Sequence, residues 1–492
     1  MAWRERAVNV ANSLDITPLM PFMARFAAPH PRPVPTGLSA VLLTLALVSC
    51  SQVPTIPEPP PTEVAAQVQV TGARGPLSQR QTTALLRRLV AQTPDAGALE
   101  RHLAIEQSVA GAPLYTGNRV TILRDGEDAF AATFAAIQAA QRYLYLEYYT
   151  LEDVQHDGQR LSDLLIARQR NGVQITVMYD SIGSISTPGE FFDRLSAAGI
   201  QVRRFNPLNP LIAHFSINDR DHRKLLLADG QRAIIGGVNL SSDYESAPFE
   251  SQSARHAGAH EPWHDTDLQI EGPAVHELKQ LFDRHWQQQG GAAAALAAED
   301  DSASASAQGD QVVRIIGSQA GGKLSPRYYA TLLSAIRSAA VQIDITAAYF
   351  APTRQEQRAL IRAVRRGVAV RLLLPSHSDS FPALAVQHSH YAALLKGSVQ
   401  IYERQDGILH SKAMVMDGVW SIVGSSNFDH RSVLFNDEVD AVVIGSQTGA
   451  QMQQFFEQDL QHAQRIEAQS WNQRPVSERL RERFWRLWEQ LL

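Results

Sequence analysis

The sequence predicts an α/β protein built from two tandem domains of the same kind. Two observations lead to this prediction: a helix–glycine–strand pattern in both halves of the chain, and a polar motif that occurs once in each half with identical spacing. Helical segments that alternate with buried strands through short connections are typical of α/β folds. The chain has 492 residues, 44% of them hydrophobic and 19% charged, which suits a globular protein with a large core.

The internal repeat is visible in two pairs of segments. Ala129–Tyr149 is similar to Tyr328–Phe350, and Leu164–Ser181 is similar to Leu360–Ser378. In each segment a helical pattern leads into an apolar strand, and in the second pair a glycine separates the two. An Ala-, Ser- and Gly-rich stretch at Gly290–Asp310 divides the halves and indicates a linker. We therefore expect each half to form one α/β domain.

The N-terminal region is typical of a secreted, lipid-anchored protein. An uncharged, mainly apolar run at Gly37–Ser49 follows Arg25 and Arg32. It is shorter than the roughly 20 residues that a membrane-spanning helix needs, so it indicates a secretory signal peptide. Leu47–Cys50 resembles the lipobox of bacterial lipoproteins, which predicts lipidation of Cys50 and anchoring to a bacterial membrane, facing the periplasm. The choice between inner and outer membrane stays open, and a buried helix is the alternative for the apolar run.

The cysteine count and the net charge exclude or disfavour several classes of protein. Cys50 is the one cysteine, which excludes an intrachain disulfide framework and zinc sites built from several thiolates. The formal charge is -5, and loss of residues 1–49 would remove four Arg, one Glu and one Asp, leaving -7. A chain this acidic is not expected to bind nucleic acid. The sequence leaves the oligomeric state open.

We predict six consecutive segments. They are a signal peptide at 1–49, a Pro-rich tether at 50–75, a first α/β domain at 76–289, a linker at 290–310, a second α/β domain at 311–470 and an amphipathic C-terminal helix at 471–492. The Pro-rich sequence after Cys50 favours an extended conformation. At Ser477–Leu492, apolar residues recur at helical spacing beside several arginines. This pattern is typical of an interfacial helix, and equally of a helix docked on its own domain.

The duplicated polar motif is the strongest functional signal in the sequence. Its five positions are His222, Lys224, Asp229, Gly236 and Asn239 in the first half, and His410, Lys412, Asp417, Gly424 and Asn427 in the second. Histidine and lysine two positions apart on a strand project from the same face, so an imidazole and an ammonium group can reach one ligand. The Asp–Gly turn then returns the chain as a second strand, which ends in a glycine-rich bend whose asparagine can also reach the site.

Two copies of the motif suit a phosphodiester substrate. Packed about a pseudo-two-fold axis, the halves would surround one pocket with two imidazoles and two ammonium groups, which complement a tetrahedral phosphate. One imidazole can attack phosphorus while the other protonates the leaving oxygen and later activates the acceptor. This chemistry requires no metal, and we expect no cofactor. A lone histidine would more often be an ordinary core or surface residue; the duplication favours a shared active site.

At these residues the sequence resembles the phospholipase D superfamily, whose signature is the duplicated H-x-K-x4-D-x6-G-[GS]-x-N motif, and more closely the bacterial cardiolipin synthases. Flanking segments match as well: Leu146–Val154, Phe191–Leu208, Pro262–Val275 and Gly424–Val439. The resemblance spans the chain from about Tyr115 to the C-terminus. It implies two tandem phospholipase D-like domains, each a mixed β-sheet flanked by helices, packed about a pseudo-two-fold axis with one shared active site.

The resemblance also implies roles for individual residues. His222 would be the nucleophile and His410 the general acid and base, although the near-symmetry of the motifs leaves the reverse order open. The phosphate oxygens would be held by Lys224, Lys412, Asn239 and Asn427. Asp229 and Asp417 would be turn residues away from the phosphate, with Gly236 and Gly424 structural. Glu438 and Asp265 would orient the histidines, with an ordinary surface carboxylate as the alternative for Asp265.

The implied activity is transfer of a phosphatidyl group between two phosphatidylglycerol molecules through a phosphohistidine, forming cardiolipin. Its partner would be anionic phospholipid in a membrane. The alternatives are a phospholipase D-type hydrolase, a nuclease, which the negative charge disfavours, and a non-catalytic lipid-binding scaffold. Many cardiolipin synthases begin with two transmembrane helices, whereas here a lipobox and tether precede the first domain. The sequence does not decide whether a second lipid or water accepts the phosphatidyl group.

Overall fold

A computed structural model describes residues 53–57, 68–93, 95–111, 113–207, 218–244, 262–293, 296–297, 306–320 and 327–491. Residues 52–492 form one compact unit. The predicted signal peptide, the lipidation site Cys50 and much of the predicted linker lie outside the described residues. Within the described part of the chain, every helix is too short or too polar to cross a bilayer.

The first half contains a mixed β-sheet. Its strands, in spatial order, are β3 (Leu114–Arg124), β13 (Thr266–Glu271), β11 (Arg232–Gly236), β10 (Lys224–Ala228), β4 (Tyr143–Tyr148), β7 (Gln174–Asp180) and β8 (Gln201–Phe205). Pairing is antiparallel from β3 to β4 and parallel from β4 to β8. The centre of the sheet is covered on both faces. For this reason every residue of β10 after Lys224 is apolar.

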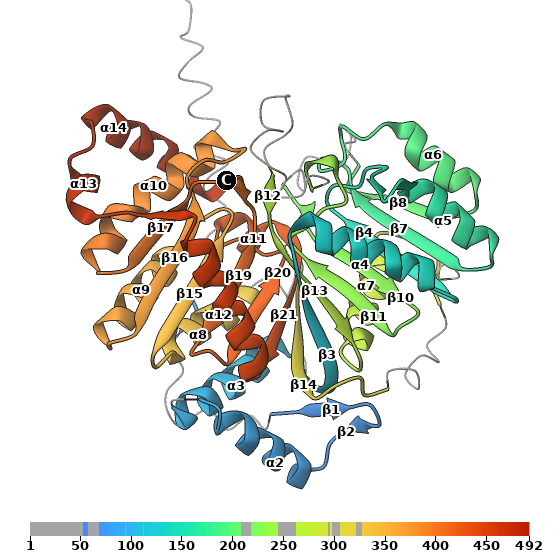
Figure 1. Cartoon of the computed structure of the whole chain (residues 1–492), viewed down its shortest axis with the longest axis horizontal. Coiled ribbons are helices and arrows are strands. Elements are labelled where there is room, and N and C mark those ends of the chain that lie inside the picture. The colour runs from blue at the N-terminus through green and yellow to red at the C-terminus, as the bar shows by residue number, and fades with distance from the viewer. Residues whose placement is uncertain are drawn as a thin grey trace, which may run out of the picture. The chain divides into compact units, whose positions relative to one another are not determined.

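The second half repeats this sheet strand for strand. The corresponding order is β14 (Gln311–Ser318), β21 (Asn436–Ile444), β20 (Trp420–Gly424), β19 (Lys412–Met416), β15 (Gln342–Ala347), β16 (Ala369–Pro375) and β17 (Gln400–Arg404). The senses of pairing are also the same: antiparallel from β14 to β15 and parallel from β15 to β17. The predicted tandem α/β fold with mixed sheets is confirmed (Figure 1).

Helices flank both sheets in equivalent places. The first half has α4 (Asp125–Ala139), α5 (Leu161–Arg170), α6 (Gly189–Ala197) and α7 (Val275–Gln288), and the second has α8 (Arg327–Ser338), α9 (Arg354–Arg365), α10 (Phe381–Lys396) and α12 (Ser446–Leu460). The repeated segments of the sequence are the units α4–β4 and α8–β15, and then α5–β7 and α9–β16. Gly172 and Gly367 have φ of 88° and 96°, a left-handed conformation that glycine adopts without strain, and each turns a helix into its strand.

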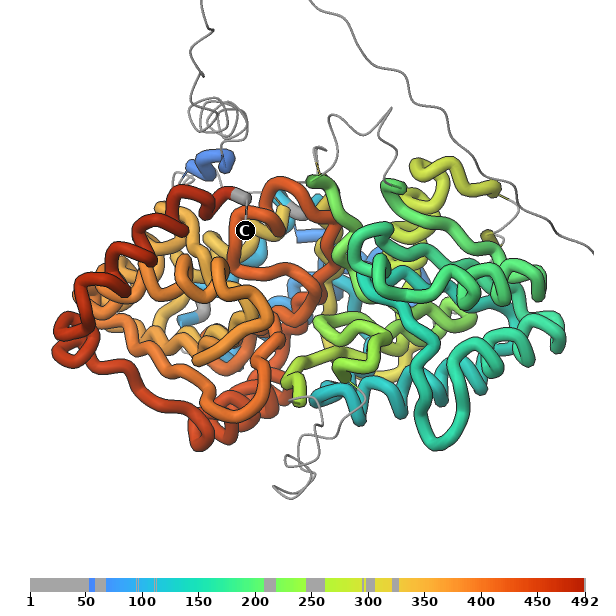
Figure 2. Tube along the Cα trace, turned by 90° about the horizontal axis from the view of Figure 1, so that it is seen from above, coloured from blue at the N-terminus to red at the C-terminus, as the bar shows by residue number. Residues whose placement is uncertain are grey.

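The two sheets are joined edge to edge and share a core. Strand β3 pairs antiparallel with β14, and apolar side chains from both sheets form one cluster, which includes Leu225 and Leu268 with Val423 and Val439. Figure 2 shows the first half, in green, beside the second half, in orange and red. Short elements complete the halves: β5 (Gln155–His156), β6 (Gln159–Arg160), β9 (Arg220–Asp221), η1 (Ser242–Tyr244), β12 (Trp263–His264), β18 (Ile408–Leu409) and α11 (His430–Leu434).

The N-terminal segment packs differently from the predicted boundaries. It forms β1 (Val70–Gly72), β2 (Gly75–Pro76), α2 (Gln79–Val90) and α3 (Ala96–Ala110). Strand β1 lies within the predicted tether, yet it pairs with β3. Helix α3, placed in the first domain from the sequence, packs against α8 of the second half, where Leu99 and Leu103 join that half's core. Apolar positions of this segment fill a face of the second domain, which the sequence alone does not indicate.

The C-terminal segment is divided into several short elements. They are β22 (Ala463–Arg465), α13 (Ala468–Asn472), α14 (Val476–Trp485) and the 3-10 helix η5 (Arg486–Leu491). The predicted helix at 471–492 is therefore interrupted. Pro475 lies between α13 and α14, where it can precede a helix but not continue one because it has no backbone N–H.

Candidate active site

A cavity of about 660 Å³ lies between the two halves, and both motif histidines line it. Tyr149 and Ile182 follow strands β4 and β7 of the first half, and Tyr349 and Asp379 follow strands β15 and β16 of the second. The pocket therefore lies beyond the carboxyl ends of the parallel strands. Its other lining residues include Arg220, His222, Asn239, Tyr244, Trp263, His410, Asn427, Arg431 and Asn436.

The motif histidine of the first half bonds an acid of the second half. Nδ1 of His222 lies 3.0 Å from Oε2 and 3.1 Å from Oε1 of the buried Glu438. Glu438 also accepts hydrogen bonds from the hydroxyls of Ser425 (2.6 Å) and Ser432 (2.8 Å) and from the amide of Asn436 (3.1 Å). Burial raises the pKa of this carboxyl, but His222, the Lys224 ammonium group and the Ser425 hydroxyl outweigh burial and lower it overall. Glu438 is thus an ionised, fixed acceptor for the His222 ring.

The motif histidine of the second half makes the reciprocal contact. Nδ1 of His410 lies 2.7 Å from Oδ2 of the buried Asp265, which belongs to the first half. The hydroxyl of Tyr244 lies 2.8 Å from the same nitrogen and 3.3 Å from the same carboxylate oxygen. Both acids predicted to orient the histidines are therefore in contact with one. Each histidine is held by the opposite half.

Short strands between the halves enforce this exchange. Strand β9, just before His222, pairs in parallel with β21, which carries Glu438, and the His222 amide donates to the carbonyl of Asp437 (2.9 Å). Strand β18, just before His410, pairs in parallel with β12, and the His410 amide donates to the carbonyl of His264 (2.7 Å). Each acid follows directly after the residue that accepts the histidine amide.

Lys224 and Lys412 are both buried beside their histidines. Nζ of Lys224 donates to the carbonyl of His222 (2.7 Å) and lies 5.3 Å from the centre of the Tyr149 ring. Nζ of Lys412 donates to the carbonyl of His410 and lies 2.8 Å from Nδ1 of that ring. Burial and the second ammonium group lower the pKa of Lys224 to about 7, and burial lowers that of Lys412 to about 8. Two buried ammonium groups so close together favour a bound anion.

The same surroundings keep the imidazoles neutral. Burial lowers the pKa of His222 to about 4, opposed by Glu438 and assisted by Lys224. Burial and the charges of Lys412 and Lys224 hold the pKa of His410 well below its usual value. At neutral pH the free protein therefore presents neutral imidazoles, the form that can act as a nucleophile or base.

The other motif positions have distinct surroundings. Asn239 and Asn427 both line the cavity. Oδ1 of Asn239 accepts from the Thr150 amide (3.1 Å), whereas the buried Oδ1 of Asn427 has no hydrogen-bond partner among the described residues. A side chain at Gly236 or Gly424 would collide with the aspartate opposite it on β13 or β21. The bend after each hairpin therefore requires glycine for close approach rather than for a positive φ.

Asp229 and Asp417 are away from the cavity and stabilise the fold. Both are turn residues with positive φ, 55° and 53°. The Asp229 carboxylate accepts from the amides of residues 141, 142 and 143 at 2.8 to 2.9 Å. The Asp417 carboxylate accepts from those of residues 340, 341 and 342 over the same range. Each aspartate thus holds the start of the neighbouring central strand, β4 or β15.

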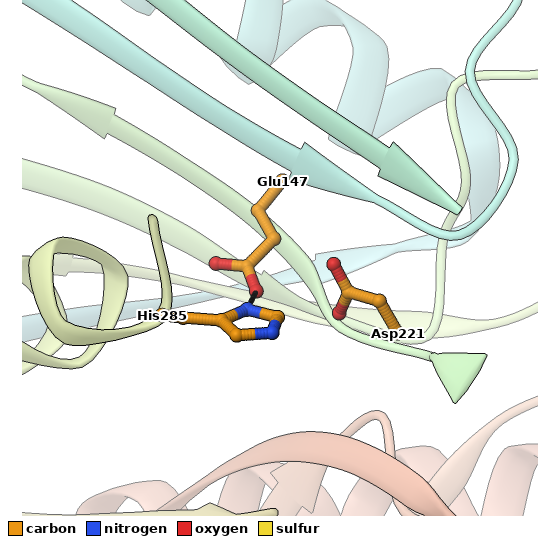
Figure 3. Close-up of side chains that lie close together, drawn as sticks. All are labelled: Glu147, Asp221 and His285. Atoms are coloured by element: carbon orange, nitrogen blue, oxygen red, sulfur yellow. Dashed lines mark hydrogen bonds and ion pairs between the residues drawn. The ribbon is translucent and has the colours of Figure 1, made fainter. Parts of the chain in front are cut away.

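A buried ion network joins the halves next to the first motif. Nδ1 of His285, on α7, lies 2.7 Å from Oε1 of Glu147, and its Nε2 lies 2.9 Å from Oδ2 of Asp437. Arg223 donates to the same Glu147 oxygen at 3.0 Å. Figure 3 shows the side chains of Glu147, Asp221 and His285 grouped together. Because Asp221 and Asp437 adjoin His222 and Glu438 in the sequence, the network fixes the segments that carry the first histidine–acid pair.

The network pairs His285 and Arg223 with the carboxylates of Glu147 and Asp437. Burial and Arg223 lower the pKa of His285, but Glu147 and Asp437 outweigh them and raise it to about 10. Among the described residues, Glu147, Asp221 and His285 place potential metal ligands within 4.8 Å of one another. Both ring nitrogens of His285 already contact carboxylates, however, and Arg223 supplies a second positive charge. We therefore assign the group as a structural ion-pair network.

Sequence reasoning missed Tyr244, Glu147 and His285. Tyr244 lies five residues after Asn239, outside the motif, at the end of the short 3-10 helix Ser242–Tyr244. His285 lies on the buried face of an amphipathic helix, a position typical of an ordinary core residue. Arg223 was the one signal in the sequence for this network. It lies between His222 and Lys224 on an extended segment, so its side chain points to the opposite face from theirs. A buried arginine on that face needs acidic partners.

The fold and the shared site define an enzyme of the phospholipase D superfamily. The family profile described as cardiolipin synthase, PLD-like domain, matches residues 134–286 and 332–460, and the phospholipase D profile matches residues 236–361. The chain therefore belongs to the family of cardiolipin synthase-like phospholipase D proteins, and it is a phosphatidyltransferase of that type.

Curated relatives agree with this assignment. A cardiolipin synthase of Geobacillus kaustophilus is 30% identical over 395 residues, covering 79% of this chain and 76% of that protein. Cardiolipin synthase A of Pseudomonas aeruginosa is 31% identical over 351 residues, covering 70% and 68%. A phosphatidylserine synthase of Haemophilus influenzae shares the fold with a TM-score of 0.60 at 12% identity, covering 80% of this chain and 100% of that structure.

Proposed function

We propose that the protein synthesises cardiolipin by transferring a phosphatidyl group from one phosphatidylglycerol to another. The observation that carries the proposal is the reciprocal pairing in one cavity, with His222 on Glu438 and His410 on Asp265. Because each carboxylate contacts Nδ1 of its ring, Nε2 is the nitrogen that would react with the substrate. Both rings line the same pocket. Family membership and relatives named cardiolipin synthase support this choice of lipid.

In the first step, Nε2 of His222 attacks the phosphorus of one phosphatidylglycerol. The phosphorus–oxygen bond to the headgroup glycerol breaks, and that oxygen takes a proton from Nε2 of His410. Lys224 and Lys412, with the side-chain amides of Asn239 and Asn427, would hold the phosphate oxygens, since opposite charges close by stabilise the developing negative charge. The bound phosphate raises the pKa of His410, so the proton enters the site with the anionic substrate.

In the second step, a glycerol hydroxyl of another phosphatidylglycerol gives its proton to Nε2 of His410. Its oxygen attacks phosphorus as the bond to His222 breaks. The products are cardiolipin and one glycerol, and both histidines return to their starting state. Water in place of the second lipid would instead yield phosphatidic acid.

The experiment is mass spectrometry of the lipids and glycerol formed by the purified full chain from phosphatidylglycerol vesicles. Cardiolipin and glycerol in equal amounts are expected. Phosphatidic acid alone would replace the proposal with a phospholipase D-type hydrolase, and no product from any phospholipid would replace it with a lipid-binding scaffold.

We further propose that Cys50 is lipidated and that the enzyme faces the periplasm. The supporting observation is the lipobox-like Leu47–Cys50 after an apolar run. Metabolic labelling with an alkynyl fatty acid tests it: wild type is expected to carry the label and Cys50→Ser to lose it. Equal labelling of the two would exclude the anchor.

A further inference from the structure

The C-terminal helix α14 and the following η5 leave their apolar face uncovered. Val476, Leu480, Phe484 and Leu487 are 66%, 58%, 55% and 72% exposed, and Phe381 at the start of α10 is 48% exposed. They belong to one surface, because Val476, Leu480 and Phe484 recur every four residues along α14, and Phe381 and Phe484 both contact the Trp485 ring edge to face. We call these five residues the apolar patch. Soluble proteins rarely expose so many large apolar side chains in one place.

The helix is nevertheless well fixed to the protein. It packs against α10, and its buried Glu482 forms an ion pair with Arg474 (2.6 Å). Glu489 on η5 pairs with the buried His390 of α10 (2.9 Å). The helix is thus docked through its polar side, and the apolar stripe seen in the sequence points outward. A helix retained only to cover its own domain would bury the opposite face.

The patch carries a local positive charge. Arg479, Arg481 and Arg483 are exposed around it, and the exposed Arg486 pairs with Glu489 (3.4 Å), while Glu482 is engaged with Arg474. This contrasts with the formal charge of -5 on the whole chain. Apolar residues surrounded by arginine side chains fit an anionic bilayer surface, where the rings and aliphatic chains enter the interface and the guanidinium groups meet lipid phosphates.

The patch also adjoins the mouth of the cavity. Phe381 follows Asp379, a cavity-lining residue, and η5 packs against α11, whose Arg431 lines the cavity. On the far side of the cavity, Ile185 is 70% exposed three residues after the lining residue Ile182. Figure 1 shows α14 beside α10 in the second half. Exposed apolar residues therefore occur within three residues of a cavity-lining position in both halves.

We propose that the apolar patch docks the enzyme onto an anionic lipid bilayer with the cavity mouth facing the membrane, so that lipid substrates enter and leave without crossing water. The proposal rests on the proposed function only in taking the substrate to be a membrane lipid. A second copy of the chain or a protein partner at this face are outcomes that the test must separate.

The test compares the full chain with the triple variant Leu480→Gln, Phe484→Gln, Leu487→Gln. The matched control is Val341→Gln, which changes an exposed apolar residue (48%) at the opposite end of strand β15 from the cavity. Turnover is measured on phosphatidylglycerol vesicles and on a short-chain phosphatidylglycerol dissolved as monomers. We expect the triple variant to lose at least about tenfold on vesicles, because three interfacial side chains are removed, and to stay within about twofold on the monomeric lipid. The control should match wild type in both assays.

Binding is measured separately, so that failure of the proposed activity would not obscure the result. Brominated phosphatidylglycerol vesicles should quench tryptophan fluorescence of the full chain, and the Trp485→Phe, Trp488→Phe variant should lose most of that quenching, leaving the share of Trp263 in the cavity wall. All variants keep the same N-terminal segment, so differences between them report the patch.

Unchanged vesicle turnover in the triple variant, or quenching as strong in the tryptophan variant as in the full chain, would overturn the proposal. A dimer that dissociates in the triple variant with vesicle binding intact would assign the patch to a second copy instead. Equal binding to phosphatidylglycerol and phosphatidylcholine vesicles would overturn the requirement for an anionic surface. Melting temperatures verify that each variant is folded.

Discussion

Replacing Glu438 by glutamine tests how the first histidine is held. The substitution keeps the size of the side chain but removes the charge that accepts from Nδ1 of His222, and it puts an amide donor among Ser425, Ser432 and Asn436, which all donate to Glu438. The ring loses both its fixed orientation and the stabilisation of any positive charge that develops on it. Glu438→Gln should therefore slow formation of the phosphohistidine.

The magnitude follows from the contact that is lost. A hydrogen bond to a charged group contributes about 1.5–3 kcal/mol, and about 1.4 kcal/mol corresponds to tenfold in rate. Turnover of phosphatidylglycerol should fall by roughly 10- to 150-fold. Ser432→Ala leaves the contact between His222 and the Glu438 charge in place, so turnover should fall by less than about tenfold, the low end of that range.

The assay is initial-rate cardiolipin formation by mass spectrometry, with the melting temperature recorded for every variant. A Glu438→Gln protein that is folded and within twofold of wild type would refute the orienting role. So would a Ser432→Ala protein that loses as much as Glu438→Gln, because the charge would then be irrelevant.

Three further predictions concern anion binding and stability. Inhibition by sulfate should weaken by more than tenfold from pH 6 to pH 9, a range in which sulfate itself does not titrate. The reason is that Lys224 (pKa about 7) and then Lys412 (pKa about 8) lose their charges. An inhibition constant that does not change with pH would contradict the role of the lysines. Asp417→Ala should lower the unfolding free energy by roughly 1.5–3 kcal/mol in urea denaturation, because three amide partners and a favourable residue for positive φ are lost; an unchanged midpoint would show that the contacts are dispensable. His285→Gln should lower the free energy of unfolding by about 3–5 kcal/mol near neutral pH. The difference in unfolding free energy from wild type should shrink as pH rises from about 6.5 through about 10, because a raised folded-state pKa stabilises the protein only while the histidine keeps its proton. A difference that stays constant over this range would exclude a charged His285.

The repeat was the part of the fold that the sequence revealed best. Helix, glycine and strand recur in the same order in both halves, and the left-handed turns at Gly172 and Gly367 depend on a residue type that is visible directly. The pairing of β1 with β3 and the packing of α2 and α3 onto the second half were not predictable in the same way. They depend on which surface is available after the two sheets join, and local patterns carry no information about that.

The active site likewise has a part that could be predicted from the sequence and a part that could not. The histidines and lysines could be identified because chemistry fixes both their type and their spacing. The partnership of Glu438 with His222 and of Asp265 with His410 could not be derived from spacing, because two acids and two histidines allow two pairings and the inter-domain strands β9 and β18 choose between them. Tyr244 has no periodic pattern at all, since it reaches His410 from a short 3-10 turn.

The central claim is that two halves build one active site, and the most direct measurement is product formation by His222→Ala and His410→Ala, each measured alone. Phosphatidylglycerol turnover by the purified full chains should fall at least a thousandfold in both variants, on the order of the loss from removing a nucleophile or its acid–base partner. If either variant kept more than about a tenth of wild-type turnover, a range well outside such losses, the two halves would be separate sites and the shared-site account would be wrong.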